Sequence, residues 1–133
     1  SRFRACRSQI DYGMFYPIQA GAAAALTGPQ DSVARIRAGY MARRDALCGG
    51  LRRIGWDVPD AQGTMFVWAK IPGKFTSSVD FVLELMEKTG VICVPGSAFG
   101  GQGEGYVRFA LVVPPERMEE AVRRIDESGI LKG

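Results

Sequence analysis

The sequence contains no histidine and only three cysteines, which lie far apart at positions 6, 48 and 93. Without histidine, the chain lacks the Ser-His and Cys-His pairs of nucleophilic enzymes and has no histidine general base. The odd number of cysteines and the absence of a Cys-x-x-Cys pair exclude the usual zinc sites, so no metal site is expected. We interpret Cys6, Cys48 and Cys93 as buried free thiols in a reducing compartment, and we expect a cytoplasmic protein.

Long apolar runs and a strong charge imbalance are also absent. No stretch approaches the roughly 20 apolar residues that a membrane-spanning helix needs, and the first residues show no signal peptide. The 17 basic and 14 acidic residues leave a net charge of +3, which does not by itself indicate nucleic-acid binding. The arginine-rich segment after Asp31 has no interleaved aromatic residues, so a helix face that is solvated, or covered by protein outside this sequence, is favoured there. We expect neither a nucleic-acid nor a membrane partner.

The apolar pattern of this 133-residue chain predicts an α+β fold: a small, mainly antiparallel sheet packed against helices and preceded by a long connecting helix. Residues 1–55 are expected to form an N-terminal segment with helices, including the long one, and residues 56–133 an α/β sandwich. Strands are expected at 56–58, 65–71, 91–94 and 106–113. Helices are expected from Pro17 to Gly28, and over about 31–54, 78–89 and 115–125. The helix over 78–89 should bury one face, made of Val79, Val82, Leu83 and Met86.

Arg108 is a charged residue inside an apolar strand, between Val107 and Phe109. Because side chains alternate along a strand, Arg108 shares a face with Tyr106 and Ala110. Its guanidinium is a planar fork that matches a carboxylate with two parallel hydrogen bonds. From the spacing alone, a solvated strand arginine and an anion-binding arginine are equally favoured.

Three other segments carry weaker signals. The five glycines between Gly96 and Gly105 follow neither of the common phosphate-binding patterns, so a flexible connection before a strand is favoured over a phosphate cradle, although Ser97 is a candidate to line a pocket. Tyr12 stands just before a helix, where hydrophobic anchoring is favoured over a binding role. The four lysines lack the desolvated context of a Schiff-base lysine and are interpreted as surface residues.

Three stretches together resemble the C-terminal part of class I/II aminotransferases: DYGMFYPIQ, GTMFVWAKIP and VICVPGSAFGGQGEGYVRFALV. These are pyridoxal-phosphate-dependent enzymes of fold type I, and the similarity is greatest to the branch with LL-diaminopimelate and alanine/aspartate-like aminotransferases. The resemblance runs from about Ser8 to Ile125. It implies that residues 56–133 form the small domain of a homodimeric parent enzyme, which transfers an amino group between an amino acid and a 2-oxo acid.

The resemblance also implies roles for individual residues. In this family, the arginine of the strand after the PGSxFG loop binds the substrate α-carboxylate, and here that residue is Arg108. Met65 is expected to border the substrate side chain. Tyr12 corresponds to a segment near the dimer interface and the partner's active site. We therefore expect Arg108, Met65, Ser97 and Tyr12 to be substrate-binding residues.

The family's Ser-Lys motif, which carries the Schiff-base lysine, has no match in these residues and should lie upstream of Ser1. We therefore expect no catalytic residue within the chain, pyridoxal 5'-phosphate in the parent enzyme and none bound to this chain alone. A first residue that is not methionine also indicates a piece of a longer protein. Two alternatives stay open: a non-catalytic ligand-binding or regulatory module on the same fold, and a β-lyase or transcription regulator of the same superfamily.

Overall fold

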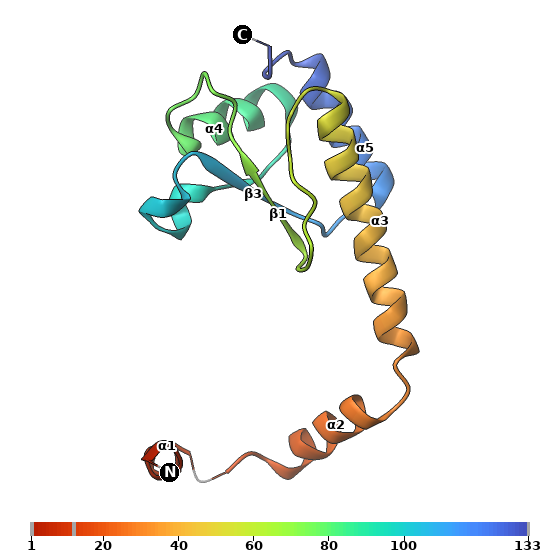
Figure 1. The fold of residues 1–133 in the computed structure, drawn as a ribbon, viewed down its shortest axis with the longest axis vertical. Helices are drawn as coiled ribbons and strands as arrows, with labels where there is room; N and C mark the ends of the chain where they lie inside the picture. Colours follow the sequence, from red (N-terminus) through yellow and green to blue (C-terminus); the bar gives the residue numbers. More distant parts are fainter. Residues whose placement is uncertain (1, 12, 133) are drawn as a thin grey trace. The chain divides into compact units, whose positions relative to one another are not determined.

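The computed structural model describes residues 2–11 and 13–132 (Figure 1). The chain divides into two compact units, Ser1–Arg35 and Ile36–Gly133. The boundary between these units lies inside the long helix, after Arg35, and the C-terminal half of that helix contributes to the core of the second unit.

The described residues of the first unit form mainly short helices, and none of these residues is buried. Helix α1 spans Arg2–Ile10 and helix α2 spans Tyr16–Thr27. The expected limits of α2 are confirmed, because Pro17 lies in its first turn and the N–H of Gly28 donates to the carbonyl of Ala24 at its end. Tyr12, one of the expected site residues, lies outside the described residues.

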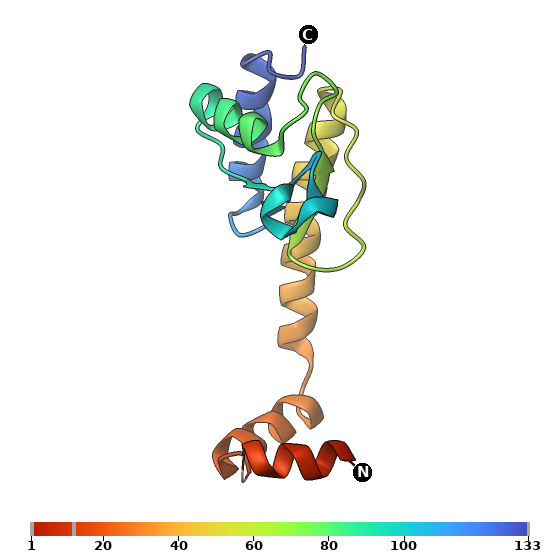
Figure 2. The ribbon, with the colours of Figure 1, turned by 90° about the vertical axis from the view of Figure 1, so that its left-hand side faces the viewer.

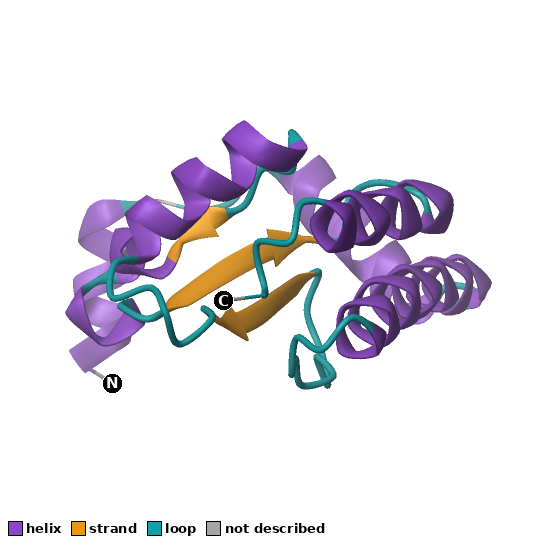
Figure 3. Cartoon of the chain, turned by 90° about the horizontal axis from the view of Figure 1, so that it is seen from above, coloured by secondary structure: helices purple, strands orange, loops and turns teal. Residues whose placement is uncertain are grey.

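Helix α3 spans Asp31–Arg53 and confirms the long helix expected from the sequence. Its apolar stripe is buried only in the C-terminal half, where Leu47 and Leu51 enter the core, whereas Ile36 is exposed. At Gly50 an added methyl group would approach the side chain of Val122 to within 2.7 Å. The glycine therefore allows α3 to pack closely against helix α5 (Pro115–Glu127), and the two run side by side in Figures 1 and 3.

A three-stranded antiparallel sheet forms the centre of the second unit. Its strands are β1 (Phe66–Lys70), β2 (Val94–Pro95) and β3 (Tyr106–Ala110), in the order β1-β3-β2. Arg108 on the central strand pairs with Trp68 on one side and Val94 on the other. The expected small antiparallel sheet packed against helices, and hence the α+β class, is confirmed.

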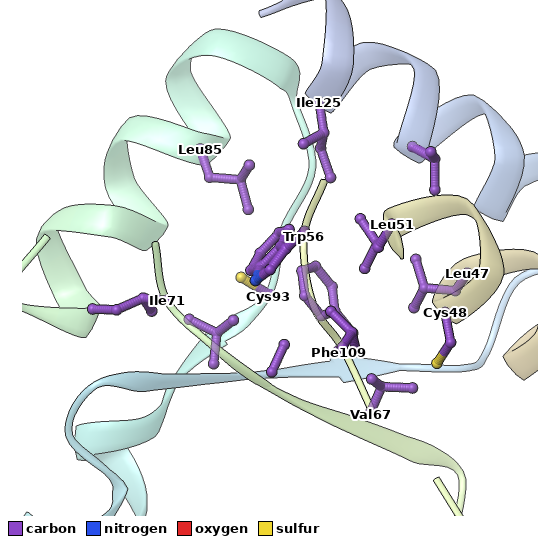
Figure 4. Close-up of a cluster of buried hydrophobic side chains, with 14 of the residues drawn as sticks. Leu47, Cys48, Leu51, Trp56, Val67, Ile71, Leu85, Cys93, Phe109 and Ile125 are labelled. Atoms are coloured by element: carbon purple, nitrogen blue, oxygen red, sulfur yellow. The ribbon is translucent and has the colours of Figure 1, made fainter. Parts of the chain in front are cut away.

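One face of this sheet is covered by α3, α5 and helix α4 (Ser78–Thr89). The core side chains fill the space between the sheet and the three helices, as Figure 4 shows. Trp56 lies in the middle, with its ring edge-on to Phe81 at 5.4 Å and to Phe109 at 5.7 Å. Burying each large apolar side chain of this kind contributes about 1.5–3 kcal/mol to folding. Four strand residues face this core: Val67, Ala69, Val107 and Phe109.

Several local expectations were wrong. Residues 56–58 form no strand, because the backbone N–H of Trp56 donates to the carbonyl of Leu51 at the end of α3, and its indole N–H donates to the carbonyl of Lys70. The strand expected over 91–94 begins only at Val94 and continues to Pro95, and the strand expected over 106–113 ends at Ala110.

Helix α4 has the expected limits, but of the four residues expected to be buried only Val82 is in the core. It is buried together with Phe81 and Leu85, whereas Val79, Leu83 and Met86 are exposed. Both triplets have helical spacing, so the periodicity alone did not decide which of them is buried. Phe81 is buried because its ring fills the space beside Trp56.

The cysteine prediction was correct for two of the three residues. Cys48 and Cys93 are buried free thiols, and burial raises the pKa of Cys93 to about 12, which keeps this thiol protonated and unreactive. Cys6 is exposed on α1, so its expected burial was wrong.

The glycine-rich connection before β3 is built as two short 3-10 turns, η1 (Gly96–Phe99) and η2 (Gly101–Gly103). It lies at the end of the sheet that is nearest the viewer in Figure 2. The backbones of Gly96 and Gly103 touch, and both residues are buried, so a methyl group on either would collide with the carbonyl of the other. The segment is therefore a close-packed structure rather than the flexible connection that the sequence favoured.

Glu104 fastens this connection to the first turn of α4. Its Oε1 accepts hydrogen bonds from the backbone N–H of Ser78 at 2.6 Å and of Gly105 at 2.8 Å. The hydrogen bond from Gly105, followed by that from Ser78, lowers the pKa of Glu104, because both stabilise the ionised carboxylate. A carboxylate at a helix N-terminus is also favoured by the helix dipole.

The first prediction concerns the touching glycines. Gly96→Ala or Gly103→Ala should lower the free energy of unfolding by about 1–3 kcal/mol, because the added methyl group meets backbone that has no free space to move into. Gly101→Ala is the control, since nothing lies within 4 Å of its added methyl group, and it should change stability by less than about 0.5 kcal/mol. Equal effects of the three substitutions in urea unfolding would contradict the close packing.

The second prediction concerns pH. The folded-state pKa of Glu104 lies below its ordinary value of 4.5, so its contribution to stability is complete above that value and is lost as the pH falls below it. Glu104→Gln should therefore be less stable than the wild type at pH 7, and the difference should shrink in acid. Glu87→Gln, on an exposed position of α4, is the control. Urea unfolding from pH 7 to pH 3 measures the difference, and a constant difference across this range would rule out the proposed role of the carboxylate.

Candidate carboxylate-binding site

The face of the sheet opposite the core carries aromatic residues around one arginine. Alternation along β1 and β3 places Trp68, Tyr106 and Arg108 on this face, where all three are half-buried or exposed. The rings of Trp68 and Tyr106 are stacked, with centroids 5.8 Å apart, and Phe99 of η1 packs edge-on against Trp68 at 5.6 Å. These contacts form a continuous aromatic surface across the sheet.

The guanidinium of Arg108 lies over the faces of two phenylalanine rings. Its Cζ is 4.0 Å from the centroid of Phe66, which comes from the start of β1, and 4.3 Å from the centroid of Phe99. A cation over an aromatic face is attracted by the ring's electrons, and more strongly where water is partly excluded. The two rings therefore stabilise a charged arginine on a half-buried surface.

Arg108 differs from the other half-buried arginines in its hydrogen bonds. Arg43 donates to the carbonyl of Leu111 at 3.1 Å, and Arg44 donates to the carboxylate of Asp45 and to the carbonyl of Ala61. Across residues 2–11 and 13–132, no carboxylate lies within ion-pair distance of Arg108, and its guanidinium donates no hydrogen bond to the protein. Its N–H groups are thus available to an anion from outside, such as a carboxylate.

Two hollows border this aromatic surface. Trp68 and Tyr106 line a groove of about 530 Å³ together with Lys70, while Met65 and Phe66 line a second groove of about 720 Å³. The second groove is closed on its other side by the α3 residues Arg37, Tyr40, Met41 and Arg44. Arg108 itself lines neither groove, whereas its neighbours on this face, Phe66, Trp68 and Tyr106, line one or the other.

The other expected site residues stand in different surroundings. Met65 precedes β1 and is exposed in the groove that it shares with Phe66. The hydroxyl of Ser97 is hydrogen bonded to the hydroxyl of Ser78 at 3.1 Å, which fastens η1 to α4. The guanidinium of Arg108 lies instead against Phe66 and Phe99, neither of which the sequence singled out. Alternation in FVWAK places Phe66 on the same face as Trp68, but no local pattern indicates that Phe99 reaches Arg108.

The residues present do not supply an amine for pyridoxal phosphate. All four lysines are exposed, whereas a Schiff-base lysine needs a desolvated setting or a nearby cation to be deprotonated at neutral pH. Lys88 is paired with Glu84 at 2.7 Å and Lys132 with Asp126 at 3.3 Å. The described residues contain no group of acidic, cysteine or histidine side chains that would hold a metal ion, and their helices are too short or too polar to cross a bilayer.

Comparisons with known proteins show which family this sequence resembles. Residues 9–125 match the family described as Aminotransferase class I and II. The chain is 44% identical to the LL-diaminopimelate aminotransferase of Halothermothrix orenii over 124 residues, which are 93% of this chain and 32% of that relative. It is 43% identical to the LL-diaminopimelate aminotransferase of Moorella thermoacetica, over 90% of this chain and 30% of the relative.

Solved structures of aminotransferases have the same fold over a similar span. The N-succinyldiaminopimelate aminotransferase of Mycobacterium tuberculosis matches with a TM-score of 0.72 at 35% identity, over 94% of this chain and 34% of that one. The alanine aminotransferase of Pyrococcus furiosus matches with a TM-score of 0.75 at 34% identity, over 84% of this chain and 29% of that one.

The chain thus spans about one third of the length of the curated relatives it matches. Pyridoxal phosphate is the cofactor that this family implies for a complete enzyme. The family match covers most of the chain, from residue 9 to residue 125, and the small antiparallel sheet agrees with it. The chain belongs to the class I and II aminotransferase family.

Proposed function

We propose that these residues are the C-terminal portion of an aminotransferase and that Arg108 binds the α-carboxylate of its substrate. The observation that carries this proposal is the guanidinium of Arg108, which is half-buried and lies over two rings but donates no hydrogen bond within the described chain. A bidentate carboxylate satisfies these donors in the plane of the guanidinium. Amino acids and 2-oxo acids both carry that carboxylate, so one arginine serves both substrates of an amino-group transfer.

The contact between Arg108 and the carboxylate serves to orient the substrate. A carboxylate held by two parallel hydrogen bonds has little freedom to rotate, so the neighbouring Cα is fixed relative to the sheet. Pyridoxal phosphate, when bound in the complete enzyme, supplies the electron sink for the transfer, and we infer that the amine that holds it comes from outside these 133 residues. The residues described here bind and orient the substrate.

The remaining site assignments are part of the same proposal. Met65 borders the substrate side chain, a role that fits its exposure in the groove beside Phe66. Ser97 lines the site from η1, the turn that also carries Phe99. Tyr12 lies close to the active site of a second subunit in a cytoplasmic homodimer. For Tyr12, the dimer and the compartment, the support is the family resemblance.

The third prediction tests Arg108 in the longer enzyme. Arg108→Ala should lower kcat/KM by about 100-fold or more, because two charge-assisted hydrogen bonds of about 1.5–3 kcal/mol each are lost. Arg108→Lys should recover only part of this loss, because an ammonium group keeps the charge but not the planar fork. Arg117→Ala, at an exposed arginine of α5, is the control. A loss smaller than about tenfold for Arg108→Ala would argue against carboxylate binding at this residue.

The fourth prediction concerns the 133-residue chain by itself. Supplied with pyridoxal phosphate, an amino acid and a 2-oxo acid, it should show no transamination above that of the free cofactor, because each of its lysines is exposed to solvent. Product 2-oxo acid is measured by coupled assay. Turnover that survives purification and disappears on Lys70→Ala or Lys88→Ala would show that the chain contains its own catalytic amine.

A further inference from the structure

We propose that Phe66 and Phe99 are positioning residues, which hold the guanidinium of Arg108 ready for a carboxylate before any ligand binds. This inference rests on the proposed function of Arg108. It adds that the affinity of the site depends on two rings that themselves form no hydrogen bond with the substrate. The observations behind it are the 4.0 Å and 4.3 Å distances from the Arg108 Cζ to the two ring centroids.

The two rings come from separate parts of the fold. Phe66 begins β1 and belongs to the strand beside Arg108, whereas Phe99 ends η1, beyond the opposite edge strand β2. Each ring lies close to the same atom, the Cζ of Arg108. Two rings from separate segments restrict the guanidinium more than one ring would.

Phe99 is held in place although 48% of its surface is exposed. Its ring packs edge-on against Trp68, and its turn is fastened to α4 by the hydrogen bond between the hydroxyls of Ser97 and Ser78. The close contact between Gly96 and Gly103 fixes the path of the chain on either side of it. An exposed phenylalanine with this much support has a defined position over the cation.

The stacking has two consequences for binding. An arginine side chain has several rotatable bonds, and the freedom that the rings have already removed is not lost again when the ligand binds. The rings also shield part of the guanidinium from water, while its N–H groups, which donate no hydrogen bond to the described residues, stay open to a ligand. A planar carboxylate that lies in the guanidinium plane fits this opening.

The fifth prediction tests the positioning with the 133-residue chain and no ligand. In the wild type, the Nε–H resonance of Arg108 should be shifted upfield by ring currents, because the guanidinium lies over ring faces. Phe66→Leu and Phe99→Leu should each move the resonance towards that of a solvated arginine, whereas Phe66→Tyr, which keeps the ring, should preserve it. Phe75→Leu is the control, because the ring of Phe75 packs against Phe81 and Lys74. Backbone amide spectra report whether each variant is folded.

The same spectra are then followed during titration with pyruvate, a simple 2-oxo acid. We expect Phe66→Leu and Phe99→Leu to weaken binding by about two- to fivefold, the range that corresponds to one cation–π contact, and Phe66→Tyr to restore it. Arg108→Ala should abolish the saturable shift changes.

The outcomes separate the two proposals. If Arg108→Ala abolishes binding while both leucine variants bind pyruvate as the wild type does, the positioning role is wrong and the proposed function stands. If the wild type and Arg108→Ala bind pyruvate equally, the proposed function fails and the positioning role fails with it. An Arg108 resonance that does not respond to loss of either ring would also overturn the positioning role.

Discussion

The one-sided burial of the three-stranded sheet is the constraint on which the rest of the structure depends. Val67 and Ala69 of β1 and Val107 and Phe109 of β3 face the three helices and are almost completely buried. Because side chains alternate along a strand, this burial forces Arg108 onto the opposite face. A slip of one residue in the pairing would bury the cation in the core and expose Val107, at a large cost in free energy. The core therefore sets the direction in which the arginine points.

The glycine-rich connection before β3 supplies a second aromatic ring, that of Phe99, to the site around Arg108. A three-stranded sheet with a two-residue edge strand is too narrow to surround a guanidinium. The contact between Gly96 and Gly103 folds the chain back on itself, and Glu104 fastens it to the N-terminus of α4. Phe99 is thereby brought over Arg108 from beyond β2. The same glycines and hydrogen bonds that stabilise the turns therefore also place an aromatic ring in the candidate site.

The sequence was sufficient for the features that depend on local pattern. Helical spacing and terminal proline or glycine residues located α2, α3, α4 and α5, and strand alternation placed Arg108 on a face with Tyr106. It was insufficient where two local patterns competed, as on α4, whose buried face is decided by contact with Trp56. It also failed for Trp56 itself, whose hydrogen bonds to Leu51 and Lys70 replace a strand ladder. Phe99 was missed because its contact with Arg108 depends on the fold of the intervening turns.

The most direct test of the central claim, that Arg108 is an open carboxylate site, is a crystal structure of the longer enzyme with a 2-oxo acid bound. We expect both carboxylate oxygens within about 3 Å of the Arg108 guanidinium nitrogens and in its plane, with the rings of Phe66 and Phe99 still against it. A substrate carboxylate held by another cation, with no oxygen within about 4 Å of Arg108, would contradict the account.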